Sequence, residues 1–273
     1  MGITATSKAC LYRTLHLHRP LRGTAVASTD TQKSSSAGET ATRNSLNELK
    51  EELELVYELI ERNRRGCVYL GSSRVHVGHR HYQLSRELAK ATAELLQCTT
   101  WSGIGEGLMD AVTLGAIEAG YNASGLNILI GEYKDDESCN TSSERTVRVH
   151  PYLLKDKYLT CKFFSARKHG LVDAGMRVSK ECKTAFFALP GGIGTLDELF
   201  EILALYQLRR VGTNETVPFF LMNYDGFYDK LLHFINETLV EYGLVNEGEL
   251  NEHLIVVRTN EEAIEYLKKF YSL

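Results

Sequence analysis

Residues 183–207 read KTAFFALPGGIGTLDELFEILALYQ, and this stretch contains one complete folding unit. Its first part is a continuous apolar run, which is typical of a strand buried on both faces. Pro190 ends that run, three glycines follow, and a helical pattern of apolar residues begins near Thr195. A buried strand, a glycine-rich turn and a helix form the repeating unit of a parallel sheet.

The rest of the chain repeats this alternation of short apolar runs and helical patterns. Runs rich in β-forming residues lie at 66–71, 98–103, 126–131, 183–190, 216–223 and 253–258, and helical patterns lie at 81–97, 106–120, 195–209, 225–241 and 260–270. Strands that alternate with helices predict a parallel sheet covered on both sides. The expected fold class is therefore α/β, with a doubly wound, mostly parallel Rossmann-like sheet and helices on both faces.

Residues 1–44 differ in composition from the remainder of the chain. They are rich in Ser, Thr and Ala and contain only two acidic residues. This composition is typical of an organelle transit peptide, and disordered tails share it. We expect order to begin at Ser45 with a helix over 45–62, and a single Rossmann-like domain over 45–273. The expected location is the cytoplasm or, if the tail directs import, a plastid.

The overall composition argues against several classes of protein. The chain has 273 residues and a formal net charge of -4, so it lacks the excess of basic residues that a nucleic-acid partner requires. No apolar run approaches the ~20 residues that span a bilayer, and we expect no membrane partner. Six scattered cysteines include no C-x-x-C pair, so we expect reduced, structural cysteines, no metal and no cofactor.

Three glycine-rich turns follow predicted strands, which is where α/β proteins bind ligands. The first contains Gly71 and Ser72, whose backbone and hydroxyl groups could act as donors. The second contains Gly103 and Gly107 in a G-x-G-x-G spacing that does not match the dinucleotide-binding motif. Its glycines could equally allow a strand and a helix to pack closely. The acidic, polar stretch 132–150 is expected to be a mobile surface loop over or near the site.

The third turn, which opens the helix near Thr195, is the most informative. Gly191, Gly192 and Gly194 would let a ligand approach the backbone, and the free N–H groups at the helix start would bind a phosphate. The turn lacks the lysine of a Walker P-loop, so triphosphate chemistry is not expected. The turn therefore predicts a site for a phosphate group.

Glu198 lies three residues beyond Thr195 and shares its helix face. A carboxylate there does not help to bind a phosphate. Glu198 is therefore either an acid that interacts favourably with the positive end of the helix dipole or a group that acts chemically on the molecule held by its phosphate. The neighbouring Asp197 and Glu201 are expected to be solvated or helix-dipole acids.

These residues carry a resemblance to a known family. PGGIGTLDE at 190–198 resembles the P-G-G-x-G-T-x-x-E signature of the Lonely Guy family of cytokinin nucleoside 5'-monophosphate phosphoribohydrolases, also known as lysine decarboxylase-like proteins. Further similar elements are GSS at 71–73, GLM at 107–109, ARK at 166–168 and NYDGFYDKLLHFI at 223–235. The resemblance implies hydrolysis of a nucleotide to a free base and ribose 5-phosphate, by a homodimer with its site near the subunit interface.

The resemblance also implies roles for individual residues. Arg167 and Glu198 take the catalytic positions. Breaking a ribosyl bond develops positive charge on the sugar, and a fixed carboxylate stabilises that charge. Arg167 cannot usefully donate a proton, so its expected work is to pair with Glu198 and with sugar or phosphate oxygens. The expected binding residues are Lys168, Gly191, Gly192, Gly194, Thr195, Gly71, Ser72, Gly103, Gly107 and Met109.

The chain also departs from the family pattern near the expected position of the base. The departures are at 102–104, at Ala166 and at 204–209, so the resemblance leaves the identity of the base open, with a cytokinin riboside 5'-monophosphate as the expected substrate. A non-catalytic nucleotide or cofactor carrier of the same fold is the alternative. Lysine decarboxylation is the least favoured, because the S-x-H-K setting of a pyridoxal phosphate lysine does not occur.

Overall fold

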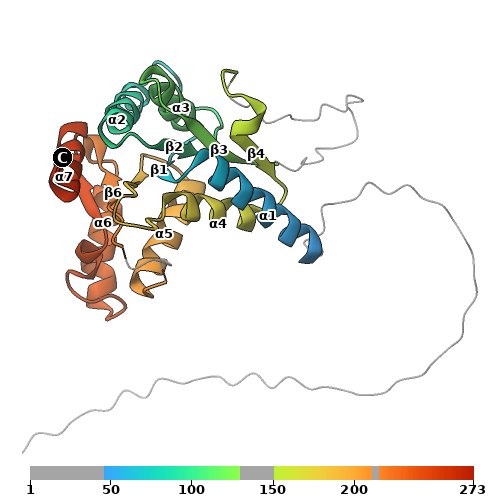
Figure 1. Ribbon diagram of the computed structural model, residues 1–273. Helices are drawn as coiled ribbons and strands as arrows, with labels where there is room; N and C mark the ends of the chain where they lie inside the picture. The colour runs from blue at the N-terminus through green and yellow to red at the C-terminus, as the bar shows by residue number, and fades with distance from the viewer. Residues whose placement is uncertain (1–45, 130–150, 211–214) are drawn as a thin grey trace, which may run out of the picture. The chain divides into compact units, whose positions relative to one another are not determined.

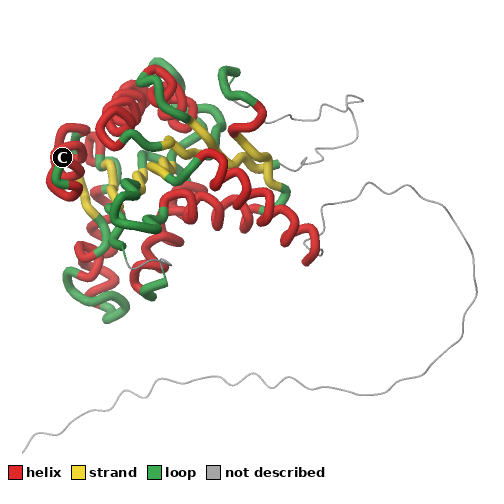
Figure 2. The backbone as a smooth tube through the Cα atoms, in the orientation of Figure 1, coloured by secondary structure: helices red, strands yellow, loops and turns green. Residues whose placement is uncertain are grey.

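The computed structural model describes residues 46–129, 151–210 and 215–273. These residues form a seven-stranded sheet in the order β4-β3-β2-β1-β5-β6-β7, and every pair of neighbouring strands is parallel (Figures 1 and 2). The strands are β1 (Gly66–Leu70), β2 (Thr99–Ser102), β3 (Ala123–Ile128), β4 (Tyr158–Cys161), β5 (Phe186–Ala188), β6 (Phe219–Met222) and β7 (Ile255–Val257). Among the described helices, none is long and apolar enough to cross a membrane.

Helices cover both faces of this sheet. One face carries α1 (Leu46–Asn63), α4 (Phe164–Gly175), α5 (Ile193–Gln207) and α6 (Asp229–His233), and the other carries α2 (Arg80–Leu96), α3 (Leu108–Glu118) and α7 (Asn260–Tyr271). Shorter helical turns lie at Lys155–Lys157, Tyr224–Gly226, Phe234–Leu239 and Glu249–Glu252. The prediction of a doubly wound, parallel α/β fold is confirmed.

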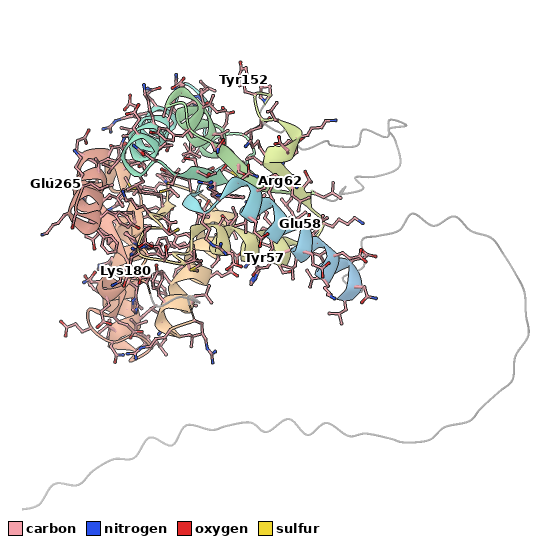
Figure 3. All side chains as sticks on the ribbon, viewed as in Figure 1. Tyr57, Glu58, Arg62, Tyr152, Lys180 and Glu265 are labelled. Carbon is pink, nitrogen blue, oxygen red and sulfur yellow. The ribbon has the colours of Figure 1, made fainter. Side chains whose placement is uncertain are left out.

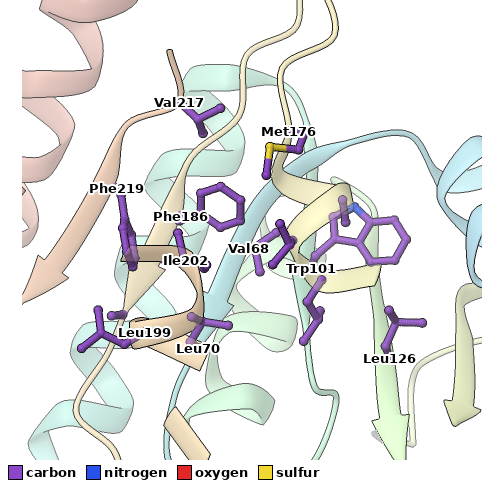
Figure 4. Close-up of a cluster of buried hydrophobic side chains, with 14 of the residues drawn as sticks. Val68, Leu70, Trp101, Leu126, Met176, Phe186, Leu199, Ile202, Val217 and Phe219 are labelled. Carbon is purple, nitrogen blue, oxygen red and sulfur yellow. The ribbon is translucent and has the colours of Figure 1, made fainter. Parts of the chain in front are cut away.

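The strands are apolar throughout because alternate side chains enter two separate cores. Val68 on β1 and Phe186 on β5 point into the core beneath α1, α4 and α5, where Trp101 and Leu126 join them (Figure 4). Tyr69, the next residue on β1, points into the opposite core. Aromatic rings stack there across three strands, with ring centroids 4.7 Å and 4.9 Å apart, and the residues are Tyr69, Phe187 and Phe220.

One strand and one α-helix were not predicted from the sequence. β4 is an edge strand of four residues, and three of them are only partly buried or exposed, so no long apolar run marks it. α4 has almost no amphipathic pattern, because its buried residues include the charged Arg167 and two glycines, while the apolar Phe164 is exposed. Gly170 is one of these glycines, and a Cβ there would lie 2.4 Å from side-chain atoms of both Val56 and Leu126. α4 can therefore approach α1 and the sheet this closely only because residue 170 has no side chain.

Three other expectations need correction or fall outside the described residues. α5 begins at Ile193, two residues earlier than predicted, so Gly194 lies in its first turn. The helix predicted over 225–241 is divided into a 3-10 turn, α6 and a π-helical segment, and Asp225 has a positive φ of 54°. The expected tail at 1–44 and the whole of the expected loop at 132–150 lie outside the described residues, so the domain boundary and the loop stay predictions.

The strand order reverses between β1 and β5, which are neighbours in the middle of the sheet. α2 and α5 leave these two strands toward opposite faces, so the turns that follow them diverge. A ligand site in a doubly wound sheet lies at such a point, beyond the carboxyl ends of the strands. The first and third glycine-rich turns of the sequence flank this point.

Candidate active site

The turn after β5 is held firmly on the sheet side. The amide of Leu189 donates to Leu70 O at 2.8 Å, and the hydroxyl of Tyr228 donates to Leu189 O at 2.6 Å. Pro190 O accepts a hydrogen bond of 3.2 Å from the amide of Ser72, which ties this turn to the turn after β1. The backbone that leads into α5 is therefore fixed before the helix begins.

The three glycines of this turn have different surroundings. A Cβ on Gly191 would lie 2.2 Å from Oγ1 of the buried Thr195, so this glycine is required for packing. A Cβ on Gly192 or Gly194 would meet nothing within 4 Å, and neither residue has a positive φ. The fold itself therefore does not require glycine at these two positions. They leave the first N–H groups of α5 open to a ligand, and Gly192 has no side chain that could cap them.

Gly71 and Gly107 bring the first and second turns together. Gly107 has a φ of 72°, and a Cβ there would lie 2.4 Å from Ser72 O. A Cβ on Gly71 would lie 3.0 Å from Cβ of Leu108, whose amide donates to Ser72 O at 2.8 Å. Close packing between the two turns accounts for these glycines. The sequence alone left this structural role open for the second turn.

Gly103 leaves room for two long side chains. A Cβ on this residue would lie 2.5 Å from Nη2 of Arg167 and 2.6 Å from Sδ of Met109. Met109 also covers Gly105, with its Cε 2.8 Å from the position of a Cβ. The second turn, the first turn of α3 and the start of α4 therefore meet around the guanidinium of Arg167.

Arg167 and Glu198 form a buried ion pair between α4 and α5. Nη1 of Arg167 contacts Oε1 of Glu198, and Nε donates to Leu126 O at 3.0 Å. Arg167 is 8% exposed and Glu198 is 7% exposed. The ring of Phe164 lies 5.6 Å from the guanidinium carbon. Arg167 is therefore held at a fixed position by β3 on one side and by the carboxylate on the other.

Burial raises the pKa of Glu198, and the positive charge of Arg167 opposes this rise. The net direction is upward, because taking the carboxylate out of water disfavours its charged form more than the ion pair favours it. Thr195 and Glu198 are both buried on the same side of α5, as their spacing predicted. The carboxylate thus lies one helical turn from the glycine turn.

Lys168, which follows Arg167 on α4, also contacts α5. Its Nζ lies 2.9 Å from Oδ2 of Asp197 and 3.3 Å from Oε2 of Glu201. Burial lowers the pKa of Lys168, but these two acids outweigh it and the pKa is raised. The expectation that Asp197 and Glu201 are merely solvated or dipole acids is corrected: both pair with Lys168 and fasten α4 to α5.

One supporting group was not identified as a site residue from the sequence. Tyr228, which holds the turn after β5, belongs to the NYDGFYDKLLHFI stretch. Asn223 accepts a hydrogen bond of 2.7 Å from the amide of Tyr228, and its own Nδ2 donates to Asp229 at 2.7 Å. This stretch therefore positions the glycine turn, and the resemblance of its sequence to the family was the signal that could have shown it.

The buried ion pair lies apart from two clefts of the described structure. Two clefts of about 640 and 410 Å³ lie at the amino ends of the strands, and neither includes Arg167 or Glu198. Within the described residues, no group of His, Cys, Asp and Glu side chains could hold a metal ion. The Arg167–Glu198 pair can place a carboxylate beside a group that is bound at the start of α5.

Comparison with known proteins identifies the family. The model of a family described as "Possible lysine decarboxylase" matches residues 109–267. The chain is 30% identical to the probable cytokinin riboside 5'-monophosphate phosphoribohydrolase LOGL2 of Oryza sativa subsp. japonica, over 82% of this chain and 81% of that protein. It is 28% identical to the cytokinin riboside 5'-monophosphate phosphoribohydrolase LOG5 of Arabidopsis thaliana, over 77% and 79%.

Among solved structures, the molybdenum cofactor binding protein from Rippkaea orientalis is 18% identical, with a TM-score of 0.47, over 76% of this chain and 98% of that chain. The family match and the extended similarity to LOGL2 cover most of the ordered elements, including all three glycine-rich turns and the Arg167–Glu198 pair. The chain therefore belongs to the Lonely Guy family.

Proposed function

We propose that the protein hydrolyses the N-glycosidic bond of a nucleoside 5'-monophosphate and releases the free base and ribose 5-phosphate. Membership of the family supports this proposal, as do the relatives whose names state that they act on cytokinin riboside 5'-monophosphates. We therefore propose a cytokinin riboside 5'-monophosphate as the substrate.

The proposed phosphate site is the first turn of α5. Its N–H groups have no partners within the helix, and the helix dipole favours an anion at this end. Gly192 and Gly194 leave this backbone uncovered. Ser72 and Thr195 lie beside the same turn and would complete the phosphate site. Gly71 and Gly107 would act by positioning Ser72.

The observation that carries the proposal is the buried Arg167–Glu198 pair one turn along the same helix. A phosphate at the start of α5 would place its ribose over this pair. As the glycosidic bond breaks, the sugar becomes positively charged, and Glu198 would stabilise that charge or orient the attacking water. Arg167 would hold the carboxylate and contact sugar oxygens, with Gly103 and Met109 lining the approach to it. Lys168 would support the pair from α4.

A homodimer is part of the same proposal. Each of the helices α1, α4 and α5 carries exposed apolar side chains, and these include Leu55, Phe164, Ile193 and Phe200. Tyr57, labelled on α1 in Figure 3, contacts α4 through a hydrogen bond of 2.9 Å with His169. A second subunit on these helices would bury these apolar groups.

The test is incubation with a panel of nucleoside 5'-monophosphates, including N6-prenylated adenosine monophosphate, followed by chromatography for free base. Release of base and ribose 5-phosphate in equal amounts is expected. Binding of a nucleotide without release of base would instead indicate a carrier. Incubation with lysine provides the control for decarboxylation, and evolution of carbon dioxide from it would contradict the proposal.

A further inference from the structure

The larger of the two clefts lies at the amino ends of the strands, away from the Arg167–Glu198 pair. It has a volume of about 640 Å³ and is formed where α1 and α2 end and where β1 and β2 begin. Its lining includes two cysteines and five charged residues, and these are Cys98, Cys182, Glu61, Arg64, Arg65, Glu181 and Lys183. This cleft has no part in the proposed hydrolysis.

Cys98 and Cys67 form a close pair of thiols at this cleft. Their Sγ atoms lie 3.6 Å apart, which is within hydrogen-bonding distance for sulfur. Cys98 is partly exposed and lines the cleft, whereas Cys67 on β1 is 1% exposed and lies behind it. The pair therefore combines a partly exposed cysteine at the cleft with a buried cysteine behind it.

The short connection between α2 and β2 positions Cys98. Gln97 ends α2 in the left-handed region with a φ of 54°, and its amide donates to Ala93 O at 2.9 Å. Cys98 follows at once and precedes the first residue of β2. Cys67, by contrast, is inside β1 and pairs with Thr100 in the sheet register. Movement that brings the two sulfurs together would therefore take place on the Cys98 side.

Hydrogen bonding and burial make the pKa values of the two thiols unequal. A hydrogen bond from Cys67 lowers the pKa of Cys98; burial opposes this effect, and the positive charge of Lys183 lowers the pKa further. Burial raises the pKa of Cys67 well above its usual value. Thiolates react with oxidants and thiols do not, so the reactive sulfur is the one that faces the cleft.

We propose that Cys98 is an oxidation site for hydroperoxides and that Cys67 is its resolving thiol. In the first step the Cys98 thiolate attacks one oxygen of hydrogen peroxide and the O–O bond breaks. The departing hydroxide takes a proton to become water, and Cys98 becomes a sulfenic acid. The peroxide gains the two electrons that the sulfur loses.

In the second step the sulfur of Cys67 attacks the sulfenic sulfur, and the S–O bond breaks. The hydroxyl group leaves with the Cys67 proton as water, and a Cys67–Cys98 disulfide forms. The sulfurs must approach from 3.6 Å to about 2.05 Å, and the proposal places this movement in the short connection after α2. A dithiol reductant reverses the product by returning two electrons.

The other described cysteines provide internal comparisons. Cys161 is 0% exposed, and burial raises its pKa to about 12, so it should stay unreactive. Cys182 also lines the cleft, and its Sγ lies 3.9 Å from Met176 O. Both cysteines line the cleft and both are partly exposed. A faster reaction at Cys98 than at Cys182 would therefore be due to the neighbouring Cys67 thiol and not to exposure alone.

The experiment is peptide mapping of the full-length, reduced protein after treatment with hydrogen peroxide. Free thiols are blocked, and the protein is digested with trypsin without reduction. The expected product links the peptide 66–74 to the peptide 91–134, which contain Cys67 and Cys98 as their only cysteines. Dithiothreitol should separate the two peptides. A peroxide-dependent link from Cys98 to Cys10, Cys139 or Cys182 would overturn the assignment of Cys67.

Two variants make the order of the steps visible. In Cys67→Ala the sulfenic acid on Cys98 has no resolving thiol, so dimedone should label Cys98 and the 66–74 link should be absent. In Cys161→Ser the link should form as in the unchanged protein. Dimedone labelling of Cys98 no faster than that of Cys161, or loss of the link in Cys161→Ser, would overturn the proposal. Mapping of the unchanged protein decides the matter even if Cys67→Ala does not fold.

Discussion

Replacement of Glu198 by glutamine is the most direct test of the proposed chemistry. The carboxylate is 7% exposed and is paired with Arg167, so bulk water screens it weakly. A unit charge about 4 Å from the developing cation interacts by about 4 kcal/mol at an effective dielectric constant of about 20. Glutamine removes the charge but keeps a dipole, so kcat should fall roughly a hundredfold to a thousandfold.

The same substitution also affects folding, and the assay has to separate the two effects. Glutamine leaves Arg167 without its buried counter-charge but keeps an oxygen that can accept its hydrogen bond. We expect a loss of about 1–3 kcal/mol in the free energy of unfolding, and therefore a Tm lower by several degrees. Base release is measured well below that Tm, and affinity for the monophosphate is measured by calorimetry. Affinity should change by less than about threefold, since the lost interaction belongs to the transition state.

Asp197→Asn is the matched control for this experiment. Asp197 lies next to Glu198 on α5 and also pairs with a cation, but its side chain is 42% exposed. Such a pair contributes about 1 kcal/mol or less, so activity should stay within a fewfold of the unchanged protein. Near-normal base release by Glu198→Gln would refute the role of Glu198 in catalysis. Equal losses in the two variants would show that the damage is a general electrostatic effect.

Four further predictions follow from the site and the fold. A nucleoside should react at least about a hundredfold more slowly than its 5'-monophosphate, because the phosphate anchors the sugar; chromatography of the free base measures both rates, and comparable turnover contradicts the phosphate site. Gly191→Ala should cost about 1–3 kcal/mol of stability through its contact with Thr195, whereas Gly192→Ala should keep its Tm and lose affinity for ribose 5-phosphate; a reversed order of Tm values would contradict this. Burial raises the pKa of Glu198, and the ionised form is required, so kcat should fall on acidification at a pH above the ordinary glutamate pKa of about 4.3. The residual activity of Glu198→Gln should not show this acidic fall in its pH profile. Deletion of residues 1–44 should leave Tm and base release nearly unchanged, since this segment has little apolar content, and a large fall in Tm would refute that expectation.

Most of the sheet could be predicted because its central strands are buried on both faces. Val68 and Tyr69 enter different cores, so burial requires apolar residues at consecutive positions and leaves a clear signal. β4 leaves no such signal because an edge strand is only partly covered. α4 was missed for a different reason: its environment is set by α1, α5 and the sheet together, and this removes the one-sided pattern on which helix prediction depends.

The sequence by itself determined the alternation of strands and helices, the glycine turn before α5 and the shared helix face of Thr195 and Glu198. All of these are local, because they depend on periodicity or on residues within one helical turn. Only the tertiary structure decided which glycines serve packing, since Gly191 is crowded by a side chain and Gly192 is not. The pairing of Arg167 with Glu198 was expected only from the family resemblance, because the two residues are 31 positions apart in sequence and meet only when α4 and α5 dock on one face of the sheet.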